Sequence, residues 1–307
     1  MTGPWPPEEG DHQEWGAALL AHGESTPAGG PAVPWWIVVM VVLGCLGYQW
    51  LVARRRGRSG RGWSRWRSAS WTSGVLLVGV ALSPALAART DQASHHMLQH
   101  VLLGMFAPLG LVLAAPVSLL LGGLAPRSGR RVVAVLRSPA VHLVSHPVSA
   151  ACLHTGLLLV VYLTPLLALS EEHTALHHAL HLHFLAAGCL FAWAVAGPDP
   201  APGRPGLVTR LGVLVLAAGV HAFLAKLLYS RGGQLPPGAG YAASEVQHAA
   251  LLMYYAGDVA EVALAVAALS VWYRASAPRA PGRGALGRGR GTVPGRASAV
   301  EPRRLGT

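Results

Sequence analysis

The chain has 307 residues, of which 52% are hydrophobic and only 12% are charged, and its mean hydropathy is +0.41. Soluble domains carry about 25% charged residues, so this composition excludes a disordered chain and an ordinary cytosolic enzyme. The net charge of +11 does not indicate nucleic-acid binding, because the arginines are concentrated in short segments between apolar stretches and in the C-terminal tail. The composition therefore predicts a membrane protein with several spans.

Residues 1–34 contain five acidic residues and no Lys or Arg, which predicts a disordered tail. Seven apolar stretches follow, each long enough for a helix that crosses about 30 Å of hydrocarbon. Their limits are 35–53, 70–88, 96–122, 147–168, 177–197, 207–229 and 246–272. Pro108 and Pro116 predict a kink or a break in the third. The sequence thus predicts an all-α membrane domain over residues 35–273 and a second disordered, basic tail over 274–307.

The charges of the connecting segments predict the orientation of this helix bundle. Segment 54–69 contains seven arginines and segment 123–146 four, and all segments on that face sum to +19. The segments on the opposite face sum to −7. Because positively charged loops stay in the cytoplasm, we expect the N-terminus outside and the C-terminus inside the cell.

Histidines are unusually frequent and unevenly placed. Twelve of the fifteen fall in the outer segments or in the outer halves of the predicted spans. Two pairs, His96/His100 and His177/His181, have the i,i+4 spacing that places both imidazoles on one face of a helix. Imidazole suits copper, zinc and haem iron, and Met97 and Met253 lie at a similar depth, so the pattern favours copper. We expect these four histidines to hold a metal ion.

Two further histidines, His221 and His248, are predicted ligands or partners of ligands in the same site. By contrast, His142 and His154 are expected to be hydrogen-bond partners between helices.

Three charged residues also fall inside the predicted spans. Lys226 with Asp258 and Glu261 is consistent either with an ion or proton relay or with an ion pair that links the last two spans. We expect the ion pair, because Lys226 lies near the outer interface.

Several of these motifs resemble one known family. The run His96-Met-Leu-Gln-His100, the span with Pro108 and Pro116, the pair His146-Pro147, the series His177, His181 and Phe184, and the LMYY–GD stretch at 252–258 are similar to the multi-span CtaG family. That family comprises cytochrome c oxidase assembly proteins of Gram-positive bacteria. The resemblance covers about residues 70–273. In one departure, Leu180 stands where family members often have an acidic residue.

The resemblance implies a multi-pass protein of the cell membrane that assists oxidase maturation without being an enzyme. Its partners would be subunits of cytochrome c oxidase, and it would help to deliver copper at the outer leaflet through His96, His100, His177 and His181. Two alternatives stay open from the residues alone. One is a membrane oxidoreductase that ligates haem through histidine, and the other is a transporter of metal ions or protons that uses Lys226, Asp258 and Glu261.

Overall fold

The computed structural model describes residues 33–60, 62–87, 91–201 and 203–276. Within these ranges the regular secondary structure is helical and contains no strand, which confirms the predicted all-α fold. The tails predicted at 1–34 and 274–307 lie outside the described residues, apart from 33–34 and 274–276.

Helices form at all seven predicted apolar stretches. Six of these regions contain one long helix each: α2 (Trp35–Ser59), α3 (Arg65–Ala81), α10 (Pro147–Leu163), α12 (Thr174–Ala196), α13 (Leu207–Ser230) and α14 (Ala243–Ser276). The remaining region is divided into α5 (Gln92–Val101), η1 (Leu102–Phe106), α6 (Ala107–Leu113) and α7 (Pro116–Gly123). Four short helices complete the described part of the chain: α4 (Pro84–Ala87), α8 (Pro126–Leu136), α9 (Pro139–Val144) and α11 (Leu166–Glu172).

Five of these helical regions are long and apolar enough to cross a membrane, and a sixth is added if α10 and α11, bent by 80°, form one span. The prediction of seven spans exceeds this number because of α3. That helix has 17 residues, whereas a membrane-spanning helix needs about 20. The described part of the chain is thus a membrane helix bundle with five or six spans by length and composition.

The predicted break in the third apolar region has two parts. Residues 102–106 form a π-helical turn just before Pro108, which lacks a backbone N–H and crowds the preceding turn. The second part is Ala115, whose φ of 55° ends the helical path before Pro116 starts α7. Proline and a widened turn are the usual causes of such bends.

A buried carboxylate stabilises the start of α7. The backbone N–H groups of Val117 and Ser118 donate to Asp199 at 3.0 and 2.7 Å. These N–H groups have no partner within the helix, and a carboxylate is favoured at that end by the helix dipole. Asp199 follows α12, so this contact ties the segment after α12 to the last piece of the broken helix.

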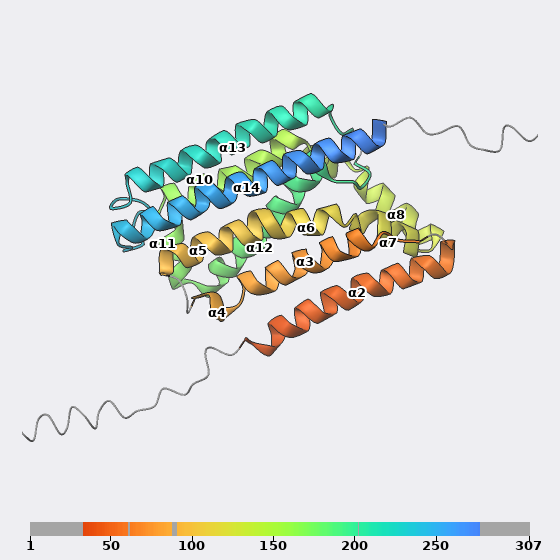
Figure 1. The fold of residues 1–307 in the computed structure, drawn as a ribbon, viewed down its shortest axis with the longest axis horizontal. Helices are drawn as coiled ribbons and strands as arrows, with labels where there is room; N and C mark the ends of the chain where they lie inside the picture. The colour runs from red at the N-terminus through yellow and green to blue at the C-terminus, as the bar shows by residue number, and fades with distance from the viewer. Residues whose placement is uncertain (1–32, 61, 88–90, 202, 277–307) are drawn as a thin grey trace, which may run out of the picture.

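Glycines bring the broken helix into backbone contact with two neighbours. A Cβ atom at Gly74 of α3 would lie 2.8 Å from the backbone nitrogen of Leu111, and one at Gly110 of α6 would lie 2.9 Å from the Cα of Gly74. On the other side, a Cβ atom at Gly188 of α12 would overlap the carbonyl oxygen of Gly104. Small residues allow membrane helices to approach closely. The broken helix therefore lies at the centre of the bundle, between α3 and α12 (Figure 1).

The long helices run along one axis, so the connecting segments gather at two ends (Figure 1). α11, the start of α5 and the turn between α13 and α14 lie at one end. α7, α8 and the C-terminal end of α14 lie at the other, together with the arginines at the end of α2 and in α8. The arginine-rich segments thus share one end of the molecule, as the charge pattern predicts.

We expect Gly110→Ala to lower the thermal stability of the detergent-purified protein, because the added methyl group forces α3 away from α6. Overpacking of this kind costs about 1–3 kcal/mol. The matched control is Gly219→Ala in α13, where an added Cβ meets nothing within 4 Å. Equal melting temperatures for the two variants would contradict the close crossing.

Candidate metal centre

Five side chains from four segments converge at the end of the bundle opposite the arginine-rich segments. The His96 and His177 rings are 5.6 Å apart between centroids, and the His177 and His181 rings are 4.3 Å apart. His96 Nε2 lies 3.0 Å from Glu171 Oε1, and the hydroxyl of Tyr241 donates to the same carboxylate oxygen. We call these five residues the end cluster.

Local sequence features place the members of this cluster. Asp91 caps α5 by accepting from the N–H of Ser94 at 2.7 Å, which sets His96 within the first turns of that helix. Pro165 excludes a continuous helix after Thr164, whose backbone is extended, and α11 turns by 80° across the end of the bundle. This turn brings Glu171 over His96.

The end cluster is partly open to its surroundings. The side chains of His96 and Glu171 are 11% and 22% exposed. His177 and His181 line a hollow of about 460 Å³, whose other walls are largely apolar and include Trp36 of α2 and Leu182. The cluster can therefore be reached from outside the bundle.

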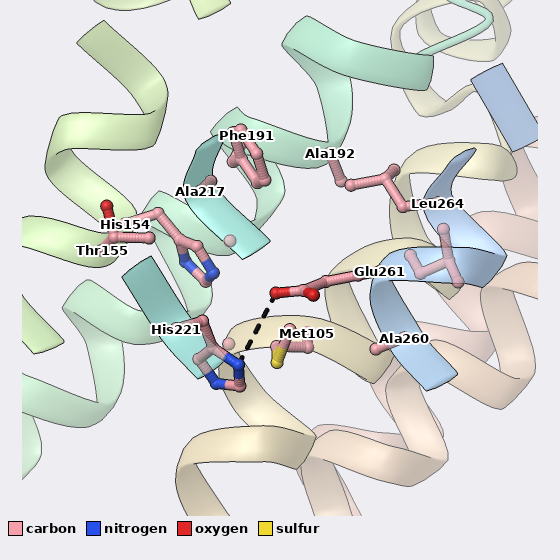
Figure 2. Close-up of a pocket in the computed structure, with 13 residues that line it drawn as sticks. Met105, His154, Thr155, Phe191, Ala192, Ala217, His221, Ala260, Glu261 and Leu264 are labelled. Carbon is pink, nitrogen blue, oxygen red and sulfur yellow. Dashed lines mark ion pairs between the residues drawn. The ribbon is translucent and has the colours of Figure 1, made fainter. Parts of the chain in front are cut away.

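A second group of polar side chains lies deeper, among the helices. His100, His221 and His154 are 2%, 1% and 5% exposed. The rings of His100 and His221 are 6.1 Å apart, and His221 Nδ1 lies 3.6 Å from Glu261 Oε1. Figure 2 shows His154, His221 and Glu261 directed into one cavity. We call His100, His154, His221 and Glu261 the core cluster.

The structure divides the predicted four-histidine set between the two clusters. His96, His177 and His181 belong to the end cluster, whereas His100 contacts His221 and the ring of Phe184. Residues four apart on a helix share a face but lie about 6 Å apart along its axis. The neighbouring helix therefore differs between the two levels: α12 lies beside the ring of His96, and α13 lies beside the ring of His100.

His248, the sixth predicted ligand, is exposed on α14 and takes no part in either cluster.

The prediction that Lys226 forms an ion pair with Asp258 or Glu261 is wrong. The ammonium of Lys226 lies over the ring of Tyr254, 5.4 Å from the ring centroid, and Glu261 faces His221 instead. Lys226 lies near the outer end of α13, where an aromatic ring is a favourable partner for a cation.

Four members of the clusters were not predicted as metal ligands: Glu171, Tyr241, His154 and Glu261. In the sequence, Glu171 contributes only a negative charge to a short outer segment, and Tyr241 lies in an irregular stretch between α13 and α14. The sequence does offer a signal for Glu171, because Glu171 and Glu172 lie six and five positions before His177. For Tyr241 the sequence offers no comparable spacing.

Among the described residues, no group of three or more His, Cys, Asp or Glu side chains is already arranged around a common point as a metal site. The end cluster nevertheless supplies three imidazoles and a carboxylate within contact of one another. These donors suit copper and zinc.

Tyr241 is held in its neutral form. Burial raises the pKa of its phenol above the ordinary value, and the carboxylate of Glu171, which accepts its hydrogen bond, raises that pKa further. The tyrosine thus acts as a hydrogen-bond donor that orients Glu171 toward His96.

We expect Glu171→Gln to lower the pKa of Tyr241, because the negative charge that opposes the phenolate is removed. Ultraviolet titration of tyrosinate in the wild type and the variant measures this shift. The same titration with Tyr241→Phe identifies the signal of Tyr241. An unchanged pKa would show that Glu171 and Tyr241 are not in contact.

Comparisons with known proteins find relatives in mycobacteria and one matching family. An uncharacterized protein of Mycobacterium leprae (strain TN) is 34% identical over 191 residues, which are 60% of this chain and 29% of that protein. An uncharacterized protein of Mycobacterium bovis is 35% identical over 178 residues, 55% of this chain and 26% of that protein. The chain therefore matches less than a third of the length of these relatives. No solved structure matches it.

The family model for the cytochrome c oxidase caa3 assembly factor (Caa3_CtaG) matches residues 46–275. This match confirms the resemblance indicated by the histidine and proline motifs. By this match over most of its length, the chain belongs to the cytochrome c oxidase caa3 assembly factor family.

Proposed function

We propose that this protein acts in cytochrome c oxidase assembly by holding a copper ion at the end cluster and passing it to an oxidase subunit. The observation that carries the proposal is the convergence of His96, His177 and His181 beside Glu171. The protein would be a carrier and not an enzyme. Membership in an oxidase assembly family supplies the partner.

The donor set of the end cluster suits this cargo. Neutral imidazoles bind copper well in either oxidation state, and a carboxylate hydrogen-bonded to one imidazole fixes its orientation and raises its basicity. Glu171 stands in this relation to His96. Met97 does not contribute its sulfur, because its thioether is buried and accepts from the hydroxyl of Tyr162 at 3.6 Å.

Partial exposure of the cluster supports transfer. An ion enclosed on all sides leaves slowly, whereas His177 and His181 line an open hollow beside α2. Its apolar walls suit an apolar segment of a membrane subunit. A ligand from that subunit could then replace one histidine at a time.

The arrangement of charges supports an orientation with the end cluster outside the cell and the protein in the cell membrane. The arginine-rich segments lie at the opposite end of the bundle, and such segments remain in the cytoplasm. Copper would accordingly be handed over at the outer leaflet.

We expect the double substitution His96→Ala with His177→Ala to reduce the copper content and the activity of cytochrome c oxidase in membranes by at least tenfold, while the variant protein is retained. Loss of two imidazoles removes most of the donors of the end cluster. Copper per oxidase, oxidase activity and the amount of variant protein are measured in the same membranes.

The matched control for this experiment is His248→Ala, because His248 is exposed on α14 outside both clusters. Its oxidase should have wild-type copper content. Normal copper content in the double variant would refute the carrier function. A Soret absorption band in the purified protein, lost in the double variant, would instead favour haem ligation.

The proposed orientation predicts that Thr174→Cys, at the start of α12, reacts with a membrane-impermeant maleimide in intact cells. Arg137→Cys, which follows α8 at the other end, should react only after permeabilisation. Both are made in a chain whose native cysteines are replaced by alanine. The reverse pattern of labelling would invert the orientation.

A further inference from the structure

A small cavity of about 30 Å³ lies within the bundle, deeper than the end cluster. It is bounded by η1, α10, α12, α13 and α14, and its polar lining consists of His154, Thr155, His221 and Glu261 (Figure 2). The sulfur atom of Met105 also faces it. This volume is enough for one or two waters or for a single metal ion.

Two of the imidazoles in this cavity lack hydrogen-bond partners. Nδ1 of His154 and both ring nitrogens of His221 are buried without one, and the nearest carboxylate oxygen lies 3.6 Å from His221 Nδ1. Buried polar atoms are almost always satisfied, so such orphans mark a place where a ligand completes the structure. Both rings are at least nine-tenths buried.

The carboxylate of Glu261 faces the same space. Its side chain is 12% exposed, and among the described residues its one ionic contact is with His221. A negative charge within a membrane helix is costly unless a cation compensates it. Lys226 does not compensate the charge of Glu261, because its ammonium lies over the ring of Tyr254.

Small residues make room for these groups. A Cβ atom at Gly257 would overlap the His221 ring, and one at Gly104 would lie 3.6 Å from Cε1 of His154 and 3.4 Å from the ring of His100. Phe191 stacks on His154 with ring centroids 5.4 Å apart, which limits its rotation. The packing therefore accommodates two imidazoles along the lining of one small cavity.

We propose that this cavity is a second metal site, which binds one cuprous ion through His154, His221 and the thioether of Met105. Neutral imidazoles with a thioether form a soft donor set that selects Cu(I). Glu261 neutralises the ion, so the filled site carries no net charge, whereas Zn²⁺ or Cu²⁺ would leave a positive charge inside the bundle. Glu261 also orients His221 through Nδ1.

This second site rests on the proposed function, because the end cluster would supply its ion. Within the core cluster, His100 follows His96 by one helical turn on α5, and its ring lies 6.1 Å from that of His221. Its ring nitrogens are also unpartnered. The cavity would store one ion behind the more exposed end cluster.

The test uses the full chain in detergent, loaded anaerobically with Cu(I) and freed of excess copper. Wild-type protein should retain two copper ions, and a variant with His96, His177 and His181 all replaced by alanine should retain one. X-ray absorption of that variant should show sulfur bound to copper. Adding Met105→Leu should remove the sulfur signal, and adding Glu261→Gln should weaken copper binding by roughly 10- to 100-fold.

Met253→Leu is the matched control, because Met253 is a fully buried methionine of α14 that does not line the cavity. It should preserve the sulfur signal. If the triple-histidine variant binds no copper, or if Met105→Leu leaves the spectrum unchanged, the second site is refuted and the end cluster is unaffected. Tighter binding of Zn(II) than of Cu(I) would also refute it. If the triple variant keeps all its copper, the proposed function fails instead.

Discussion

The high cost of placing a polar side chain in hydrocarbon governs this structure. A membrane helix can carry an imidazole or a carboxylate only if that group faces the interior of the bundle or another polar group. Three histidines on α5, α10 and α13 obey this constraint: His100, His154 and His221 are nearly inaccessible. The core cluster of polar groups is therefore a consequence of folding in a membrane.

The central broken helix allows the polar groups to meet. Glycine contacts bring α3 and α12 against its backbone, and the π-helical turn before Pro108 contributes Gly104 and Met105 to the lining of the core cavity. π-Helical turns are frequent at functional sites, where an extra residue changes the direction of the side chains that follow. Here the turn begins two residues after His100, at the boundary between α5 and the rest of the helix.

The two clusters differ in the way that carrier and storage sites differ. The end cluster combines three imidazoles with a carboxylate beside a hollow of about 460 Å³, as the proposed carrier role requires. The core cluster has the same kinds of donor around a much smaller cavity of about 30 Å³, and its histidines are nearly inaccessible. Burial of these donors favours retention of an ion in the proposed storage site, because it limits the access of water and competing ligands.

The sequence by itself determined the helical membrane fold, the positions of the helices and the end of the bundle that carries the arginines. These properties follow from hydropathy and charge, which act locally along the chain. It also indicated which residue types to consider as metal ligands, because histidines at i,i+4 spacing share one face of a helix. The number of spans was less certain from sequence, since α3 is apolar but short.

Only the tertiary structure decided which histidines meet. Spacing places His96 and His100 on one helix face, but the partner of each ring depends on the depth at which neighbouring helices cross. Those crossings depend on glycines and on the 80° bend that brings Glu171 to His96. Contacts between helices distant in the chain leave no periodic signal in the sequence, which is why the two clusters emerge only from the packed bundle.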